Sequence, residues 1–510
     1  MPQSKEDKGK EPSKVVGREG WSAIILAAGK GTRMKSPLPK VLHPVAGVPM
    51  IKKAIDAVRG AGAEEIRVVV GHGEALVRKI IEPMGVVCFA QQNQWGTADA
   101  VRAADPSSLK GDVMILNGDH PLLMAEHVTA ALSAHRELKA AVSVLTSVVK
   151  RPGSLGRIVR SGGELRAIVE AADASRDTLA ICEVNSGIYF ATAEALEDLL
   201  PRVQNHNAKN EFYLTDIVSI AQELSERVAA IASPPAVAFG VNSQSELAQA
   251  TRILFGRKCR ELMNAGVLII DPRTTYVEAD VEIGAGSVLY PGAYLRGKTR
   301  IGSACVIEPN CYIAHSRIED GAHIRAGSYL EEAVISARAT VGPYARLRPG
   351  TEIGVEAHVG NFVEMKKTKF GARSKAGHLS YLGDAIIGED VNVGCGAITC
   401  NYAVDRGKYR TKIGDRVFVG SDVQFVAPVE IGADAVIASG STIVADVPER
   451  ALAIARSRQT IKDNYVPSRE LMAPETRPEK QPEMRPETAV KDGLECAESS
   501  DTSAHSPRKT

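Results

Sequence analysis

A short loop near the start of the chain combines residue types suited to binding an anion. The stretch WSAIILAAGKGTRM, residues 21–34, ends an apolar run with two glycines and two cations. We expect residues 23–27 to form a buried strand, and the glycines after it let backbone N–H groups approach a phosphate. The closing Gly-Lys-Ser/Thr of a P-loop is missing, and Met34 stands where a dinucleotide-binding fingerprint needs a third glycine. The loop therefore predicts phosphate binding, with an ordinary tight turn as the alternative.

The elements that must position this loop alternate between strands and helices as far as about residue 241. The patterns predict strands at 66–71, 86–92 and 112–119 and helices at 74–82 and 97–104. This rhythm indicates an α/β domain with a mostly parallel sheet flanked by helices, which binds ligands at the carboxyl ends of its strands. The opening loop lies at one such end, and NGDHP, which contains Asp119, lies at another.

The second half of the chain has a different period. After a helical stretch at 243–266, branched apolar residues recur every six positions and are often followed by glycine. Three runs carry this repeat: Ile283, Leu289, Leu295, Ile301, Ile307 and Ile313; Val341, Leu347, Ile353, Val359 and Met365; Ile413, Val419, Phe425, Ile431, Ile437 and Ile443. A period of six predicts a β-solenoid, in which each short strand points one side chain inward and the next corner turns the chain. The period does not determine the handedness.

Composition excludes several classes of protein. With 510 residues and a formal net charge of +1, the chain is expected to form several domains without a large nucleic-acid-binding face. No run of about 18 apolar residues predicts a membrane span, and residues 1–20 do not resemble a signal peptide. The eight scattered cysteines predict reduced thiols in a cytoplasmic protein, because Cys395 and Cys400 lack the partners of a zinc site.

Motifs in both halves resemble one known family. LAAGKGTRMKSPLPKVLHPVAGVPM, at 26–50, is similar to the opening of sugar-phosphate nucleotidyltransferases. RLRPGTEIG, HVGNFVEMKK, KAGHLSYLGDA, NVGCGAITCNY and ALAIARSRQT, between 346 and 460, complete a resemblance to the bifunctional bacterial enzymes that make UDP-N-acetylglucosamine, a precursor of peptidoglycan and lipopolysaccharide. The resemblance implies an N-acetylglucosamine-1-phosphate uridyltransferase joined to a glucosamine-1-phosphate N-acetyltransferase, and it implies that the solenoid is a left-handed parallel β-helix that trimerises.

This resemblance also suggests domain boundaries. We expect a disordered tail at 1–20, a uridyltransferase domain at 21–242, a linker helix at 243–266, an acetyltransferase β-helix at 267–458 and a mostly disordered extension at 459–510.

At the uridyltransferase site the resemblance implies contacts with UTP and the sugar phosphate. The nucleotide set is Leu26, Ala27, Ala28, Gly29, Arg33, Lys40, Gln91, Gly96 and Thr97, and the sugar set is Gly156, Glu170 and Asn185. Asp119 and Asn242 match ligands of Mg²⁺, a cation that prefers oxygen. Each of these residues has an alternative structural role. Asp119 could cap the helix that follows NGDHP, and Asn242 could cap the helical stretch that begins at residue 243. Asn117 departs from the tyrosine that is common in the family.

At the acetyltransferase site a protonated amine cannot attack a thioester, so a general base is needed, and histidine is suited to this role near neutral pH. The resemblance gives that role to His378, with Glu364 as a possible supporting group. The glucosamine-1-phosphate set is Arg348, Lys366, Tyr381 and Asn392, and the acetyl-CoA set is Cys395, Asn401, Tyr402, Ser421, Ser439 and Arg456. Cys395 and Ser439 each replace a common alanine, and the loop at 403–408 has an unusual length.

Two other functions remain open. The chain could be a single-activity sugar-1-phosphate nucleotidyltransferase with a purely structural β-helix, or a regulatory subunit similar to those of a eukaryotic nucleotide-exchange factor. Both would leave the motifs around His378 without a purpose. A shallow solenoid face rarely encloses a ligand, so we expect acetyl-transfer sites between the subunits of a homotrimer. The expected partners are small-molecule substrates, without nucleic acid or a membrane.

Overall fold

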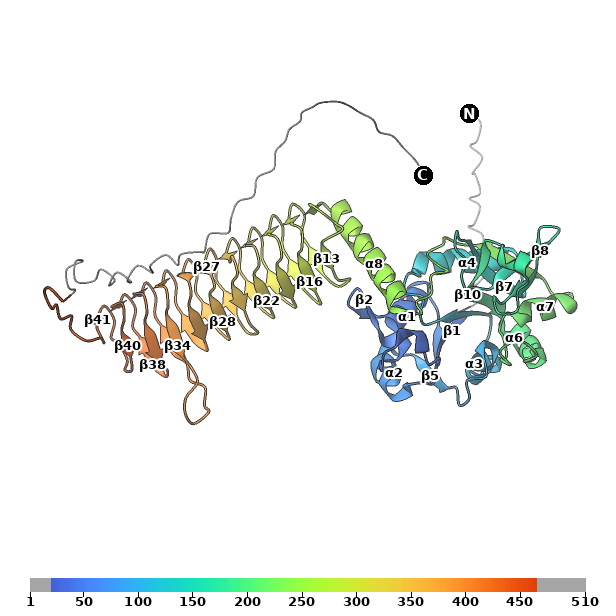
Figure 1. Cartoon of the computed structure of the whole chain (residues 1–510), viewed down its shortest axis with the longest axis horizontal. Coiled ribbons are helices and arrows are strands. Elements are labelled where there is room, and N and C mark those ends of the chain that lie inside the picture. Colours follow the sequence, from blue (N-terminus) through green and yellow to red (C-terminus); the bar gives the residue numbers. More distant parts are fainter. Residues whose placement is uncertain (1–19, 466–510) are drawn as a thin grey trace, which may run out of the picture. The chain divides into compact units, whose positions relative to one another are not determined.

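The computed structural model describes residues 20–465, which form an α/β domain, a long helix and a β-helix (Figure 1). The predicted tail at 1–20 therefore lies outside the described residues except for residue 20, and the predicted extension at 459–510 lies outside them from residue 466 on. Within residues 20–465 there is no helix with the length and hydropathy of a membrane span. The seven cysteines of this part are all free thiols, as the sequence predicted.

The α/β domain is built on a mixed, mostly parallel sheet of nine strands in the described residues, with the main order β11-β7-β10-β6-β1-β4-β5. The strands are β1 (Trp21–Ala27), β4 (Glu65–Val70), β5 (Val87–Ala90), β6 (Asp112–Asn117), β7 (Val142–Val148), β8 (Arg157–Ser161), β9 (Glu164–Val169), β10 (Glu183–Thr192) and β11 (Val228–Ala232); a separate ribbon pairs β2 (Pro44–Val45) with β3 (Val48–Pro49). The helices are α1 (Met50–Gly60), α2 (Glu74–Ile81), α3 (Thr97–Ala103), α4 (Ala125–Glu137), α5 (Arg176–Leu179), α6 (Ala193–Leu199) and α7 (Asp216–Glu223).

The predicted strands and helices of this domain are confirmed, with small differences at their ends. Strand β1 begins at Trp21 rather than residue 23, because Trp21 and Ser22 also pair in register with β6. Strand β10 runs antiparallel to both β6 and β7, which makes the sheet mixed. The register of β10 shifts between Asn185 and Tyr189, and such a bulge redirects side chains next to a binding site.

Helix α8 (Gln244–Asn264) forms the predicted helical stretch between the two halves. Its N-cap is Ser243, whose side chain accepts a hydrogen bond from the backbone N–H of Glu246 at 3.3 Å. The carboxylate of Glu246 in turn accepts a hydrogen bond from the backbone N–H of Asn242 at 2.7 Å. Because Ser243 is the N-cap, the Asn242 side chain does not have the capping role that was its alternative function.

The β-helix is a left-handed coil of short parallel strands with three flat faces. Face 1 contains β12 (Leu268–Ile269), β15 (Val288–Leu289), β18 (Val306–Ile307), β21 (His323–Ile324), β24 (Thr340–Val341), β27 (His358–Asn361), β30 (Lys375–His378), β33 (Asn392–Val393), β36 (Phe418–Val419), β39 (Val436–Ile437) and β41 (Leu452–Ala453). Face 2 contains β13 (Tyr276–Val277), β16 (Tyr294–Arg296), β19 (Tyr312–Ala314), β22 (Tyr329–Glu331), β25 (Arg346–Leu347), β28 (Glu364–Lys366), β31 (Tyr381–Gly383), β34 (Ile398–Cys400), β37 (Gln424–Val426) and β40 (Thr442–Ile443). Face 3 contains β14 (Glu282–Ile283), β17 (Arg300–Ile301), β20 (Arg317–Ile318), β23 (Val334–Ile335), β26 (Glu352–Ile353), β29 (Lys369–Phe370), β32 (Ala385–Ile387), β35 (Thr411–Ile413) and β38 (Val429–Ile431).

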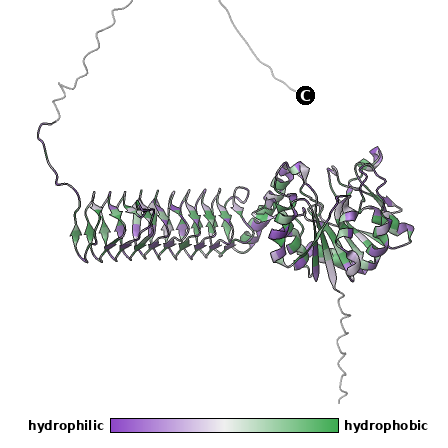
Figure 2. Cartoon of the chain, turned by 90° about the horizontal axis from the view of Figure 1, so that it is seen from below, coloured by the Kyte–Doolittle hydropathy of each residue, from purple (hydrophilic) through white to green (hydrophobic). Residues whose placement is uncertain are grey.

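The six-residue repeat supplies the core of this coil. On face 3, for example, Ile335, Ile353 and Phe370 stand in register on successive strands, and each is at most 2% exposed. Stacking the strands joins the inward side chains into a continuous apolar column. Hydrophobic and hydrophilic residues alternate along the ribbon of the β-helix (Figure 2). Burying each branched side chain contributes about 1.5–3 kcal/mol, so stability accumulates coil by coil.

Truncation inside this column is expected to destabilise the β-helix. Ile353→Ala should cost about 2–5 kcal/mol, because the coils above and below hold the cavity open. The matched control is Glu352→Ala on the same strand, whose side chain points outward and makes an exposed ion pair with Lys369. That change should cost less than about 1 kcal/mol. Denaturant unfolding followed by circular dichroism measures both, and equal losses would contradict the assignment of the core.

Candidate active sites

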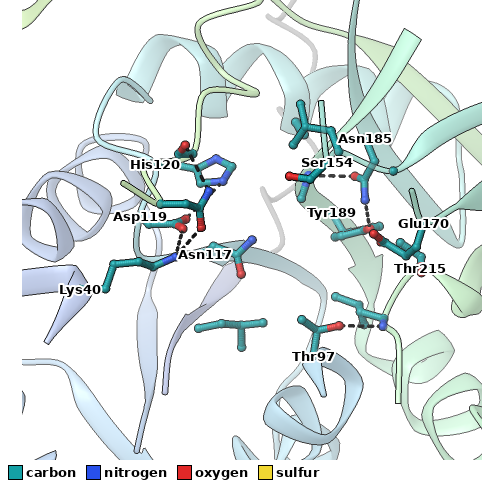
Figure 3. Close-up of a pocket in the computed structure, with 18 of the residues that line it drawn as sticks. Lys40, Thr97, Asn117, Asp119, His120, Ser154, Glu170, Asn185, Tyr189 and Thr215 are labelled. Atoms are coloured by element: carbon teal, nitrogen blue, oxygen red, sulfur yellow. Dashed lines mark hydrogen bonds and ion pairs between the residues drawn. The ribbon is translucent and has the colours of Figure 1, made fainter. Parts of the chain in front are cut away.

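Two adjoining cavities open at the carboxyl ends of β1 and β6. One, of about 260 Å³, is lined by the whole predicted loop from Leu26 to Gly29 together with Gln91, Gly96 and Thr97. The other, of about 330 Å³, is lined by Arg33, the predicted sugar set Gly156, Glu170 and Asn185, and Asn242 (Figure 3). Leu26, Lys40, Thr97, Asn117 and Asp119 line both cavities. The fold thus brings every predicted uridyltransferase residue to one place, with the predicted nucleotide residues mostly around the first cavity and the predicted sugar residues around the second.

A lysine connects the two predicted metal ligands. The ammonium group of Lys40 donates hydrogen bonds to Oδ2 of Asp119 and, at 3.0 Å, to Oδ1 of Asn242. Asp119 is only 6% exposed, and although burial alone would raise its pKa, the Lys40 ammonium holds the pKa of this carboxyl below its usual value. Two oxygens that converge on one cation form a donor set suited to Mg²⁺. Helix α4 has Met124 as its N-cap, so Asp119 does not cap that helix.

The wall of the first cavity depends on hydrogen bonds around the turn before α3. Nε2 of Gln91 donates to the carbonyl of Gly96 at 3.2 Å and to the carboxylate of Asp99 at 2.7 Å. The hydroxyl of Thr97 accepts a hydrogen bond from the backbone N–H of Leu214 at 2.9 Å. These contacts fix the shape of the cavity wall, in addition to any contact that the same residues make with a ligand.

One acidic residue, the half-buried Glu170, lines the larger cavity, and other acidic residues lie around it. Burial raises the pKa of Glu170, and Asp173, Asp216 and Glu211 add to this effect. Burial together with Asp173 raises the pKa of Asp216 to about 6. Nδ2 of Asn185 donates to the Tyr189 hydroxyl at 2.6 Å, and Oδ1 of Asn185 accepts from the backbone N–H of Gly187 at 2.8 Å. The amide of Asn185 is therefore held firmly at the bulge in β10.

The predicted acetyl-transfer residues lie on the outside of the β-helix, at and near the corner between faces 1 and 2. We call this edge the site corner, defined by His378, Cys395, Ser421 and Ser439. Backbone hydrogen bonds stack the coils along it, from Gly396 N–H to Leu379 O at 3.1 Å, from Asp422 N–H to Cys395 O at 2.7 Å and from Gly440 N–H to Ser421 O at 2.8 Å. His378 is exposed at this edge. Parallel register thus aligns residues far apart in sequence into one strip.

Face 2 carries the predicted phosphate-binding cations beside this strip. Nη1 of Arg348 donates to Glu364 at 3.0 Å. The neighbouring Lys408, by hydrogen bonding and repulsion, lowers the pKa of Lys366, with a smaller effect from Arg348. Cations that face one another in this way favour an anionic ligand. Lys408, which the sequence analysis did not select, lies in the loop 401–410 that projects beside β34 (Figure 1).

The other predicted residues of this site either bond to residues of neighbouring coils or lie exposed on the surface. Glu364 pairs with Arg348 on the preceding coil, and no hydrogen bond between Glu364 and His378 occurs in the described residues. Nδ2 of Asn401 donates to Asp384 at 2.6 Å. A Cβ at position 383 would lie 2.5 Å from the Tyr381 hydroxyl and 2.9 Å from Nδ2 of Asn401, so these two groups are close together. Asn392, Tyr402 and Arg456 are exposed.

A methyl group at Gly96 should disturb the nucleotide cavity. Gly96 has a φ of 126°, and a Cβ would lie 2.5 Å from the carbonyl oxygen of Phe212. Gly96→Ala is expected to destabilise the α/β domain by more than about 1 kcal/mol and to raise the KM for UTP. Acetyl transfer by the same chain is the internal control. A KM for UTP equal to that of the unmodified protein would contradict this view of the cavity wall.

The raised pKa of Asp216 predicts a pH-dependent stability. A carboxyl whose pKa is higher in the folded than in the unfolded state destabilises the folded state once it ionises. The free energy of unfolding therefore falls as pH rises from about 3.8 through about 6. Asp216→Asn should therefore stabilise the α/β domain more at about pH 7.5 than at about pH 5. Thermal unfolding at both pH values measures the effect, and a gain that shrinks as pH rises would contradict it.

Comparison with known proteins agrees with this arrangement. The family of MobA-like NTP transferase domains matches residues 23–265, and the bacterial transferase hexapeptide family, with six repeats, matches residues 410–445. The bifunctional protein GlmU of Bdellovibrio bacteriovorus is 60% identical over 444 residues, which cover 87% of this chain and 97% of that protein.

Further relatives carry the same description. The bifunctional protein GlmU of Pelobacter propionicus is 48% identical over 88% of this chain and 98% of that protein, and that of Trichlorobacter lovleyi is 49% identical over 87% and 97%. The resemblance found in the motifs is thereby confirmed over both halves. The chain belongs to the GlmU family of bifunctional enzymes, in which a nucleotidyltransferase domain precedes a hexapeptide-repeat transferase domain.

Proposed function

We propose that the chain makes UDP-N-acetylglucosamine in two steps. The β-helix acetylates glucosamine-1-phosphate with acetyl-CoA, and the α/β domain then transfers UMP from UTP to N-acetylglucosamine-1-phosphate. The observation that carries this proposal is the pair of adjoining cavities, because one contains the predicted nucleotide residues, the other contains the predicted sugar residues, and Lys40 and Asp119 line both.

Uridylyl transfer asks mainly for positioning and charge neutralisation. A phosphate oxygen of the sugar phosphate attacks the α-phosphorus of UTP, the bond from that phosphorus to the bridging oxygen breaks, and pyrophosphate leaves. Arg33 and Lys40 orient the phosphates, while Glu170 and Asn185 orient the sugar. Asp119 and Asn242 would hold Mg²⁺, and their convergence on the Lys40 ammonium supports this role. When bound, the cation neutralises phosphate charge.

Acetyl transfer needs a base for the amine of glucosamine-1-phosphate. The exposed imidazole of His378 takes a proton from this amine as its nitrogen attacks the thioester carbonyl. A backbone N–H near Cys395 stabilises the resulting oxyanion, and the coenzyme then leaves as a thiol once it has gained a proton. Arg348 and Lys366 bind the sugar phosphate, and the remaining residues of the site corner, together with Asn401, Tyr402 and Arg456, contact acetyl-CoA.

The open position of His378 supports a homotrimer. A single chain would contact a ligand on this exposed strip from one side only. In a threefold assembly, a neighbouring subunit would contact the other side of the ligand. Because UTP and acetyl-CoA are metabolites of the cytoplasm, we propose that the enzyme acts there. Its partners are these small-molecule substrates.

Crossed variants test the proposal. Asp119→Asn should lower uridylyl transfer by about 100-fold or more, because loss of even an orienting partner of a metal ligand costs about 10–100-fold. His378→Ala should lower acetyl transfer by about 10²–10⁴-fold, the usual contribution of a general base. Each variant should keep the other activity, and a mixture of both should again form UDP-N-acetylglucosamine.

The same assays separate the alternatives. Acetyl transfer that persists in His378→Ala would remove the assignment of the base. Absence of acetyl transfer in the unmodified protein would favour a single-activity nucleotidyltransferase, and absence of both activities would favour a regulatory subunit.

A further inference from the structure

We propose that Nε2 of His120 is a third protein donor at the cation site, which adds an imidazole nitrogen to the oxygens of Asp119 and Asn242. This inference rests on the proposed function, since it extends the cation site assigned there. It also predicts a preference among metals, because an imidazole ligand favours transition metals such as Co²⁺ over Mg²⁺.

One hydrogen bond determines which nitrogen of His120 can bind a metal. Nδ1 lies 3.2 Å from the backbone carbonyl oxygen of Val237. A carbonyl only accepts hydrogen bonds, so Nδ1 must carry a proton. In the neutral imidazole this leaves Nε2 with an unshared electron pair, which is the form that binds metal ions. A backbone carbonyl on the other ring nitrogen is also the usual way in which proteins orient a metal-binding histidine.

The free nitrogen faces the free oxygen of the metal-binding carboxylate. Nε2 of His120 lies 3.5 Å from Oδ1 of Asp119, and this buried oxygen has no hydrogen-bond partner. His120 itself is only 4% exposed. Two buried electron-pair donors at this distance repel each other unless a positive centre lies between them or a proton is shared. Figure 3 shows the imidazole beside the carboxylate, on the side away from Lys40.

Glycines keep the space in front of these two atoms open. A Cβ at Gly240 would lie 3.2 Å from Nε2 of His120 and 3.7 Å from Oδ1 of Asp119. A Cβ at Gly187 would lie 3.9 Å from the same nitrogen. Both glycines, as well as His120, Asp119 and Asn242, line the cavity that contains the sugar set. A cation at Nε2 and Oδ1 would therefore be reachable by phosphate oxygens in this cavity.

The size of the donor set also fits a site completed by substrate. Within residues 20–465 no group of three or more His, Cys, Asp and Glu side chains is arranged to hold a metal ion. Asp119 lies between the two other donors: its Oδ1 faces the imidazole of His120, and its Oδ2 meets the amide oxygen of Asn242 at the Lys40 ammonium. The remaining positions around a cation would belong to phosphate and water. A site with few protein ligands is more sensitive to the identity of each one.

The test uses pulsed electron paramagnetic resonance of Mn²⁺ bound to the full chain with UTP, without sugar phosphate. A nitrogen hyperfine coupling typical of a coordinated imidazole is expected in the unmodified protein. Mn²⁺ with UTP alone is the control for nitrogen of the base. The matched variant is His120→Asn, whose amide nitrogen can still donate to the Val237 carbonyl but cannot reach the position of Nε2.

In His120→Asn the nitrogen coupling should vanish. Affinity for Co²⁺, measured by titration in the presence of UTP, should fall by about tenfold or more, while affinity for Mg²⁺ should fall less. Retained acetyl transfer and an unchanged thermal unfolding temperature show that the variant folds. The spectrum of the unmodified protein tests the proposal even if the variant does not fold.

The outcomes separate this inference from the proposed function. Bound Mn²⁺ without nitrogen coupling in the unmodified protein would overturn the role of His120 alone. A coupling that persists in His120→Asn would also overturn it. If no cation binds with UTP, both the inference and the proposed cation site are wrong.

Discussion

Parallel strand register is the constraint on which both halves of this protein depend. The carboxyl ends of parallel strands all lie at the same edge of a sheet, so residues that follow different strands can meet although they are far apart in the sequence. In the α/β domain this brings Lys40, after β1, to Asp119, after β6, although 79 positions separate them. In the β-helix the same register stacks coil on coil, so that one corner position repeats as His378, Cys395, Ser421 and Ser439.

The two halves use this constraint to build different kinds of site. The α/β domain surrounds its polar groups, and burial strengthens the attraction between the Lys40 ammonium and the Asp119 carboxylate because little water competes with it. The β-helix fills its interior with apolar side chains, so its functional groups stay on the outside. A cation pair such as Lys366 and Lys408 is tolerated there because water screens it. The residues proposed for uridylyl transfer thus lie in an enclosed site, and those proposed for acetyl transfer lie on an open surface.

Much of this arrangement is predictable from the sequence, and the reasons differ between residues. The period of six identifies the β-helix because only one inward side chain per strand fits its core, as Ile353 shows. Asp119 is predictable because it ends a buried strand. Spacing does not predict the antiparallel direction of β10, since a strand pattern carries no direction. The pairing of Glu364 with Arg348 depends on coil register, and the sequence analysis instead suggested a supporting role beside His378. His120 was missed, although its place next to Asp119 in NGDHP was the available signal.

The central claim is that one chain contains two separate catalysts that act in sequence. The most direct measurement follows the unmodified protein with glucosamine-1-phosphate, acetyl-CoA, UTP and Mg²⁺ by phosphorus NMR and mass spectrometry. The account predicts that free N-acetylglucosamine-1-phosphate appears first, followed by UDP-N-acetylglucosamine and an equal amount of pyrophosphate. Formation of UDP-glucosamine without prior acetylation, or consumption of acetyl-CoA without any pyrophosphate, would contradict it.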